Sequence, residues 1–229
     1  MPGLDPLVFS ASTWVLPILF AITLHEAAHG WVAWRLGDDT AKLRGRVTFN
    51  PLAHVDPVGT VILPALLFIS PVPFIFGWAK PVPVNFARLR RPKRDMAIVA
   101  AAGPVTNICL AVGSAAAMHL TVLLPQITTL WVQQSLRNSL IINVVLAVLN
   151  MLPLPPLDGG RVAVGLLPSS LALPLHRLER YGFLILLALL FIPPFIGSRI
   201  GLNLNVFAWL IGVPAEFIIR LIVVGTGLS

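Results

Sequence analysis

Charge is scarce in this chain. Only 11% of its 229 residues are charged, whereas 57% are hydrophobic and the mean hydropathy is +0.88. A typical soluble domain has about 25% charged residues. The composition therefore excludes an ordinary soluble domain, a disordered chain and a nucleic-acid-binding module. At roughly 20 residues per span, the chain has room for five or six membrane-spanning helices and no sizeable soluble domain.

Cysteine is also nearly absent. Cys109 is the single cysteine, which excludes a disulfide framework and a cysteine-based metal cage. Lysine and arginine are missing from residues 1–34. Because a cleaved signal peptide needs a basic N-terminal region, we interpret the first apolar run as a membrane span.

Six apolar runs follow one another along the chain. They cover residues 7–34, 55–79, 95–124, 138–157, 181–197 and 202–225. Most of the 16 Lys and Arg residues follow the first, second and fourth runs. Loops rich in Lys and Arg stay in the cytoplasm. We therefore expect a multi-pass protein of the bacterial plasma membrane, with the N-terminus outside and the C-terminus in the cytoplasm.

The run 55–79 has basic clusters at both ends, so a full crossing would place one cluster on the wrong side. We expect instead a re-entrant hairpin that enters as a helix near Gly59–Ile69 and returns as extended chain from Phe76 to Asn85. The predicted fold is an all-α polytopic membrane protein with about five transmembrane helices plus this hairpin. Six full spans are the alternative. Short strands are predicted at Gly45–Phe49 and Lys80–Asn85.

The basic run at residues 88–94 flanks an apolar span and has no interleaved aromatic residues. These features favour contact with anionic lipid over binding of nucleic acid, so we expect a lipid bilayer and no nucleic acid among the partners. The extended return at Lys80–Asn85 has two readings. It could pair with an unwound substrate along one edge, or it could only plug a cavity.

The first span carries the motif His-Glu-x-x-His at His25, Glu26 and His29. Residues i and i+4 lie on one face of a helix, so both imidazoles can bind one metal ion. Glu26 is then placed to act as a general base on a metal-bound water. Ionisable groups inside an apolar span are costly unless they are paired or metal-bound, which favours a metal site.

Zinc in a catalytic site needs a third protein ligand, and the best candidate is Asp158. It follows a proline-rich stretch, Pro153–Pro156, which must interrupt the helix. Gly159 and Gly160 then allow a tight turn that can direct the carboxylate back toward the histidines.

Three motifs together resemble the site-2 protease family of intramembrane zinc metalloproteases. They are the histidine motif, Asn150-x-x-Pro153 ending in Asp158-Gly159, and the segment Ala102–Asn107. The resemblance covers residues 9–165, and its order matches the order in the family. It lies closest to a compact bacterial branch without a PDZ or CBS domain. We therefore expect one integral membrane domain over residues 1–229, with a catalytic core at about 9–165 and a C-terminal helical pair at about 181–225.

The resemblance implies one Zn²⁺ per chain, bound by His25, His29 and Asp158, with Glu26 as the base. It implies cleavage of a transmembrane protein or peptide near the cytoplasmic face, and no further cofactor. It also implies that Asn150 positions the substrate or assists the oxyanion. The sequence leaves open the substrate, the oligomeric state and a need for prior cleavage by another protease.

Two residues beside the re-entrant run, His54 and Asp56, have two interpretations. They could support the metal ligands or gate access to the site. Alternatively, they could only shape a turn at the membrane surface. Two other functions also stay open for the whole chain: a catalytically silent relative that binds membrane clients, and a metal-binding transporter.

Overall fold

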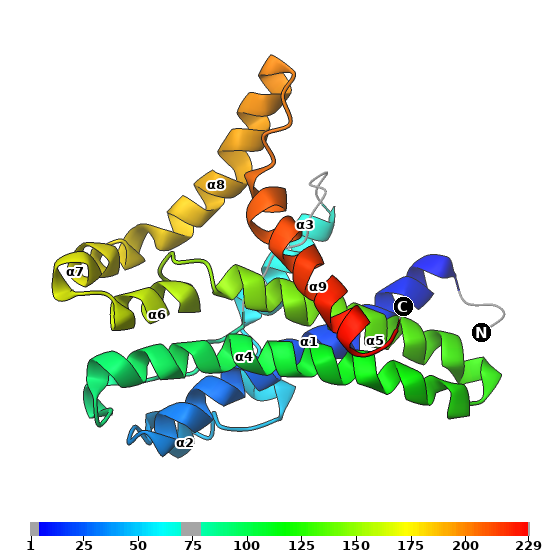
Figure 1. Cartoon of the computed structure of the whole chain (residues 1–229), viewed down its shortest axis with the longest axis horizontal. Helices are drawn as coiled ribbons and strands as arrows, with labels where there is room; N and C mark the ends of the chain where they lie inside the picture. The colour runs from blue at the N-terminus through cyan, green and yellow to red at the C-terminus, as the bar shows by residue number, and fades with distance from the viewer. Residues whose placement is uncertain (1–4, 70–78, 229) are drawn as a thin grey trace.

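The computed structural model describes residues 5–69 and 79–228, and these residues are predominantly helical. Five of the described helices are long and apolar enough to cross a membrane, which confirms an all-α polytopic membrane protein (Figure 1). The α-helices are α1 (Pro6–Arg35), α2 (Thr40–Leu43), α3 (Leu63–Ile69), α4 (Pro92–Met118), α5 (Gln126–Asn150), α6 (Asp158–Leu166), α7 (Ser169–Arg177), α8 (Glu179–Ile200) and α9 (Val213–Gly225).

Helices α1, α4 and α5 form the central bundle, and α9 packs against α4 and α5 (Figure 1). Small side chains such as Ala111 and Ala115 are fully buried where these helices meet. Small residues allow helix backbones to approach closely in a membrane, where lipid gives no hydrophobic drive for association. The bundle can therefore hold polar groups between tightly packed helices.

Helix α5 begins earlier and ends earlier than the apolar run 138–157 predicted. The polar side chains of its first half find partners inside the protein. Gln133 donates to the Thr121 hydroxyl at 3.0 Å, and Asn138 donates to the Thr13 hydroxyl at 3.0 Å. These hydrogen bonds make polar residues acceptable within a span, and the helix stops at Asn150, just before the prolines.

The re-entrant run begins with a π-helical turn, Pro57–Ile62, and continues into α3. The predicted return from Phe76 lies partly outside the described residues, which resume at residue 79. The Lys80 amide donates to the His54 carbonyl at 2.9 Å, and the Arg46 guanidinium donates to the carbonyls of Ala53 and Lys80. The two ends of the run therefore meet on one side, as a re-entrant hairpin requires.

The two predicted strands are wrong for the described chain. Residues 45–49 form a turn and bends, and 80–85 are extended without a hydrogen-bonded partner strand among the described residues. Pro81 and Pro83 lack amide hydrogens, while the Asn85 amide donates to Asp38 at 2.6 Å. The extended segment is thus anchored by side chains of α1 and its neighbours in place of a sheet.

The C-terminal pair departs from the expected topology. Helix α8 diverges from the bundle, and α9 returns onto it (Figure 1). His119, at the end of α4, has its Nε2 2.7 Å from the Thr226 carbonyl oxygen. At the same end, Trp131 donates to Ser12 in the first turns of α1. The first turns of α1 and the end of α9 therefore lie at one end of the bundle, whereas the prediction put the two termini on opposite sides of the membrane. The side that each terminus faces stays a prediction.

Candidate metal centre

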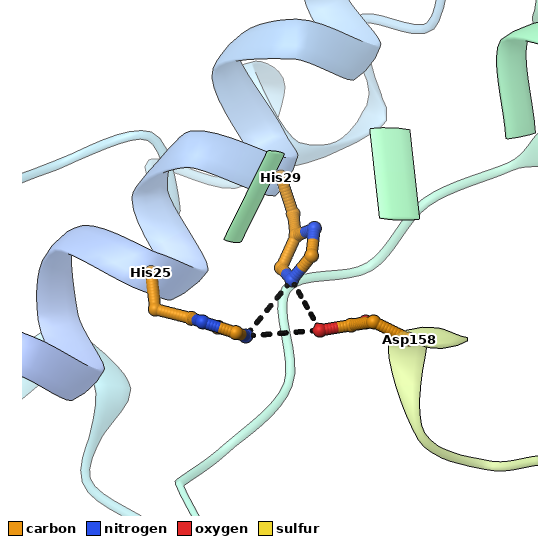
Figure 2. Close-up of side chains that lie close together, drawn as sticks. All are labelled: His25, His29 and Asp158. Atoms are coloured by element: carbon orange, nitrogen blue, oxygen red, sulfur yellow. Dashed lines mark hydrogen bonds and ion pairs between the residues drawn. The ribbon is translucent and has the colours of Figure 1, made fainter. Parts of the chain in front are cut away.

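The two motif histidines converge from one face of α1, and Asp158 meets them from the start of α6 (Figure 2). The Nε2 atoms of His25 and His29 are 3.0 Å apart. The Oδ2 atom of Asp158 lies 3.1 Å from Nε2 of His25 and 3.3 Å from Nε2 of His29. All three residues are buried.

The turn before α6 places Asp158 in this cluster. The chain leaves α5 at Asn150 and passes the proline-rich stretch before α6 begins at Asp158 itself. A Cβ atom at Gly159 would overlap the main chain of Met151, and one at Gly160 would overlap that of Leu154 and Pro155. The two glycines are needed because the turn folds directly against the chain that precedes it.

Both imidazoles are held through their Nδ1 atoms. Nδ1 of His25 lies 2.5 Å from Oδ1 of Asn107, and Nδ1 of His29 lies 2.7 Å from the Val99 carbonyl oxygen. Each partner is an oxygen that accepts hydrogen bonds, so each neutral ring carries its proton on Nδ1. Each Nε2 then has a free lone pair that faces the other two candidate ligand atoms of the cluster.

With both rings neutral, the lone pairs of three atoms face one another without a proton between them. These atoms are Nε2 of His25, Nε2 of His29 and Oδ2 of Asp158. The buried Oδ2 of Asp158 accepts no hydrogen bond. Ligands at zinc–ligand distances of about 2.0–2.1 Å in a tetrahedron are about 3.3 Å apart, close to the separations between these three atoms. Two imidazoles and a carboxylate are a donor set that suits zinc.

The Asp158 carboxylate, in a short helix outside the membrane-spanning segments, is kept ionised. Burial alone would raise the pKa of Asp158. When the imidazoles of His25 and His29 are protonated in place of binding a metal ion, their hydrogen bonds and positive charge outweigh burial and lower this pKa well below its usual range. The ligand is thus charged at neutral pH, as binding of a divalent cation requires.

Gly103 of α4 packs against both imidazoles, so a larger residue at this position should disturb the metal ligands. A Cβ atom there would overlap Nε2 of His29 and would lie 2.6 Å from Nε2 of His25. We expect Gly103→Ala to weaken zinc binding more than tenfold, because the methyl group displaces the atoms that bind the metal. Zinc affinity is measured by competition with a chromogenic chelator.

The matched control for this substitution is Gly113→Ala in the same helix. Nothing lies within 4 Å of a Cβ at Gly113, and alanine favours a helix over glycine by up to about 1 kcal/mol. This variant should bind zinc like the wild type and unfold at the same or a higher temperature. Equal zinc affinity in both variants would show that α4 does not confine the ligands.

A cavity of about 570 Å³ opens beside the cluster. Glu26 lines it together with the three candidate ligands and a mostly apolar wall that includes Leu146, Leu149 and Phe183. Oε2 of Glu26 accepts a hydrogen bond from the Val82 amide at 2.8 Å. The extended segment 79–85 therefore holds the carboxylate by a main-chain contact at the edge of the cavity.

The remaining predicted site residues lie in different positions. Asn150 lines the cavity, and its side chain donates to the Leu146 carbonyl of its own helix at 3.0 Å. His54 is buried with Nε2 3.1 Å from the Thr48 carbonyl oxygen. Asp56 caps the next helical turn by accepting from the amides of Val58 and Gly59. The side-chain hydrogen bonds of His54 and Asp56 are local, and the gating role of these residues stays a prediction.

Gly103 and Asn107 belong to the segment Ala102–Asn107, whose resemblance to the family implied no role for either residue. Their spacing was the available signal, because residues i and i+4 share one face of a helix. The contact from Val82 to Glu26 had no signal of its own, since any residue except proline supplies a main-chain amide.

Comparison with known proteins agrees with this site. "Putative zinc metalloprotease YwhC" of Bacillus subtilis (strain 168) is 36% identical over 191 residues, which cover 78% of this chain and 80% of that protein. "Putative zinc metalloprotease Rip2" of Mycolicibacterium smegmatis is 33% identical over 76% of this chain and 65% of that protein. Its namesake in Mycobacterium tuberculosis (strain ATCC 25618 / H37Rv) is 30% identical over 80% of this chain and 68% of that protein.

No protein-family model and no solved structure matches the chain. The identity to the Bacillus protein nevertheless extends over most of both chains and accompanies a buried His-His-Asp cluster that could hold a metal ion. The chain belongs to the site-2 protease family of zinc metalloproteases.

Proposed function

We propose that this protein is a zinc-dependent intramembrane endopeptidase. It hydrolyses peptide bonds in or near the transmembrane segments of membrane proteins, on the cytoplasmic side. The observation that carries the proposal is the position of the metal cluster on α1, a helix apolar enough to span a membrane, beside a cavity with mostly apolar walls. Such walls suit a substrate made of apolar residues.

Each residue of the site has a proposed role. His25, His29 and Asp158 hold the zinc ion. When bound, zinc polarises the scissile carbonyl group and lowers the pKa of a water molecule. Glu26 takes a proton from the attacking water and gives it to the nitrogen of the leaving amine. Asn150 lines the same cavity, where its amide can turn from Leu146 and donate to the substrate carbonyl oxygen.

The topology proposal puts the N-terminus outside and the metal centre near the cytoplasmic face. Basic residues support it, since Arg35, Lys42 and Arg44 follow the end of α1 that carries His29. The contact of His119 with Thr226 favours an outer position for the C-terminus as well. One integral membrane domain at the plasma membrane, with its core at about 9–165, is the corresponding proposal for the whole chain.

The two other functions differ in what they require of the site. A silent relative that only binds clients does not need Glu26, which is present and lines the cavity. A metal transporter needs metal-binding side chains along a path across the membrane. Among the described residues, the candidate ligands instead cluster at one depth. A protease is therefore favoured.

The test combines metal content with cleavage. Wild-type protein, purified in detergent without chelators, is analysed for zinc and then incubated with a synthetic transmembrane peptide. We expect about one zinc per chain and cleavage that is lost with chelation and restored by zinc. Zinc without cleavage of any of a panel of such peptides would favour the client-binding function, and absence of metal would contradict the proposal.

A further inference from the structure

We propose that Asn107 is the positioning residue of the metal centre: it fixes the proton of His25 on Nδ1 and thereby presents Nε2 to the metal. This inference rests on the zinc site of the proposed function. It adds a residue on α4 that touches neither the metal nor a substrate. Asn107 has no solvent exposure, and its Oδ1 lies 2.5 Å from Nδ1 of His25.

The orientation of the Asn107 amide follows from its other two contacts. Its Nδ2 atom lies 3.2 Å from the Ala21 carbonyl oxygen and 2.7 Å from Oδ1 of Asn143. Both of these atoms are acceptors, so the NH₂ group must face them. The carbonyl of the amide is then the group that faces His25, and it can only accept. Nδ1 of His25 must therefore be the donor.

The two histidines differ in what secures them. His29 donates to the main-chain carbonyl of Val99, which no side-chain substitution removes directly. His25 depends on a side chain, and within residues 5–69 and 79–228 Asn107 supplies the acceptor. Partners of this kind fix the tautomer and orientation of a metal-binding histidine, and their loss typically lowers metal affinity about 10–100-fold.

The support for Asn107 reaches α5. Asn143 donates to the Ser139 carbonyl at 2.9 Å, and the Ser139 hydroxyl pairs with that of Ser114 on α4 at 2.7 Å. This polar chain joins α1, α4 and α5 within their membrane-spanning parts. Unpaired polar groups are costly there, so each amide is held in one orientation by its neighbour.

The experiment compares three variants by zinc affinity and by the visible spectrum of the cobalt-substituted protein. Asn107→Leu should weaken zinc binding about 10–100-fold and change the cobalt bands, because His25 loses its acceptor. Asn107→Asp in its protonated form keeps an acceptor for Nδ1 and a hydroxyl that can donate to the Ala21 carbonyl. It should bind zinc more tightly than Asn107→Leu and restore the wild-type spectrum. The thermal unfolding temperature of each variant confirms that it is folded.

Asn138→Leu is the matched control. Asn138 is equally buried and also joins α1 to α5, through Thr13, but it has no bond to either histidine. We expect a lower unfolding temperature with unchanged zinc affinity and an unchanged cobalt spectrum.

Wild-type affinity and spectrum in Asn107→Leu, or equal losses in Asn138→Leu, would overturn the inference. A wild-type protein that binds zinc without cleaving peptides would contradict the proposed protease but leave this result valid. The two failures are therefore distinguishable.

Discussion

Glu26→Gln should lower peptide cleavage by about 10²–10⁴-fold, the contribution typical of a general acid–base, while zinc remains bound. Glutamine cannot take a proton from water, but its side-chain oxygen still accepts from the Val82 amide, so the extended segment should stay in place. The measurement is the initial rate of cleavage of a transmembrane peptide at saturating zinc, with metal content determined on the same samples.

The control for this substitution is Glu216→Gln. Glu216 lies on α9, where it is exposed and pairs with Arg220, and such a pair contributes little to stability. Its removal should leave cleavage and zinc content unchanged. Wild-type cleavage by Glu26→Gln would show that another group accepts the proton. Loss of zinc in that variant would instead make Glu26 part of the metal binding.

The second large effect is expected from Asp158→Asn. This substitution removes the anionic member of the cluster, whose contacts with both imidazoles are 3.1 and 3.3 Å. The loss of a direct ligand should exceed the loss of a supporting residue. We therefore expect zinc affinity to fall more than about 100-fold and cleavage to vanish at submicromolar free zinc. Isothermal titration of the metal-free protein with zinc gives the affinity.

Asp56→Asn makes the same chemical change outside the cluster. Asparagine caps a helix about as well as aspartate, so the turn at Val58 should persist. Zinc affinity and a cleavage rate both equal to those of the wild type would support a structural role for Asp56. A reduced cleavage rate with intact zinc binding would support the gating role predicted for this residue. If both variants kept full affinity, the assignment of Asp158 as a ligand would be wrong.

The cluster of His25, His29 and Asp158 was predictable because short sequence patterns indicate how each ligand is presented. His25 and His29 share a helix face, and the glycines after Asp158 indicate a turn. The re-entrant hairpin was predictable from charge alone, and the hydrogen bond from Lys80 to His54 agrees with it.

Other features depend on tertiary partners that the sequence does not identify. The first half of α5 looks too polar for a span until Gln133 and Asn138 meet Thr121 and Thr13. The extended segment 80–85 has the alternation of a strand, but Asp38 and Glu26 supply acceptors that a neighbouring strand would otherwise provide. The role of Asn107 could not be predicted for the same reason, since it depends on the contact of α4 with His25 of α1.

Val82 both lines the cavity and holds the Glu26 carboxylate. Its contact with the carboxylate uses only its main-chain amide. The wall of the cavity can therefore change shape or size at this residue while the carboxylate stays anchored, and proline is the one replacement that removes the anchor. Under the proposed function, a side-chain change at this residue can therefore alter which substrates fit without displacing the base.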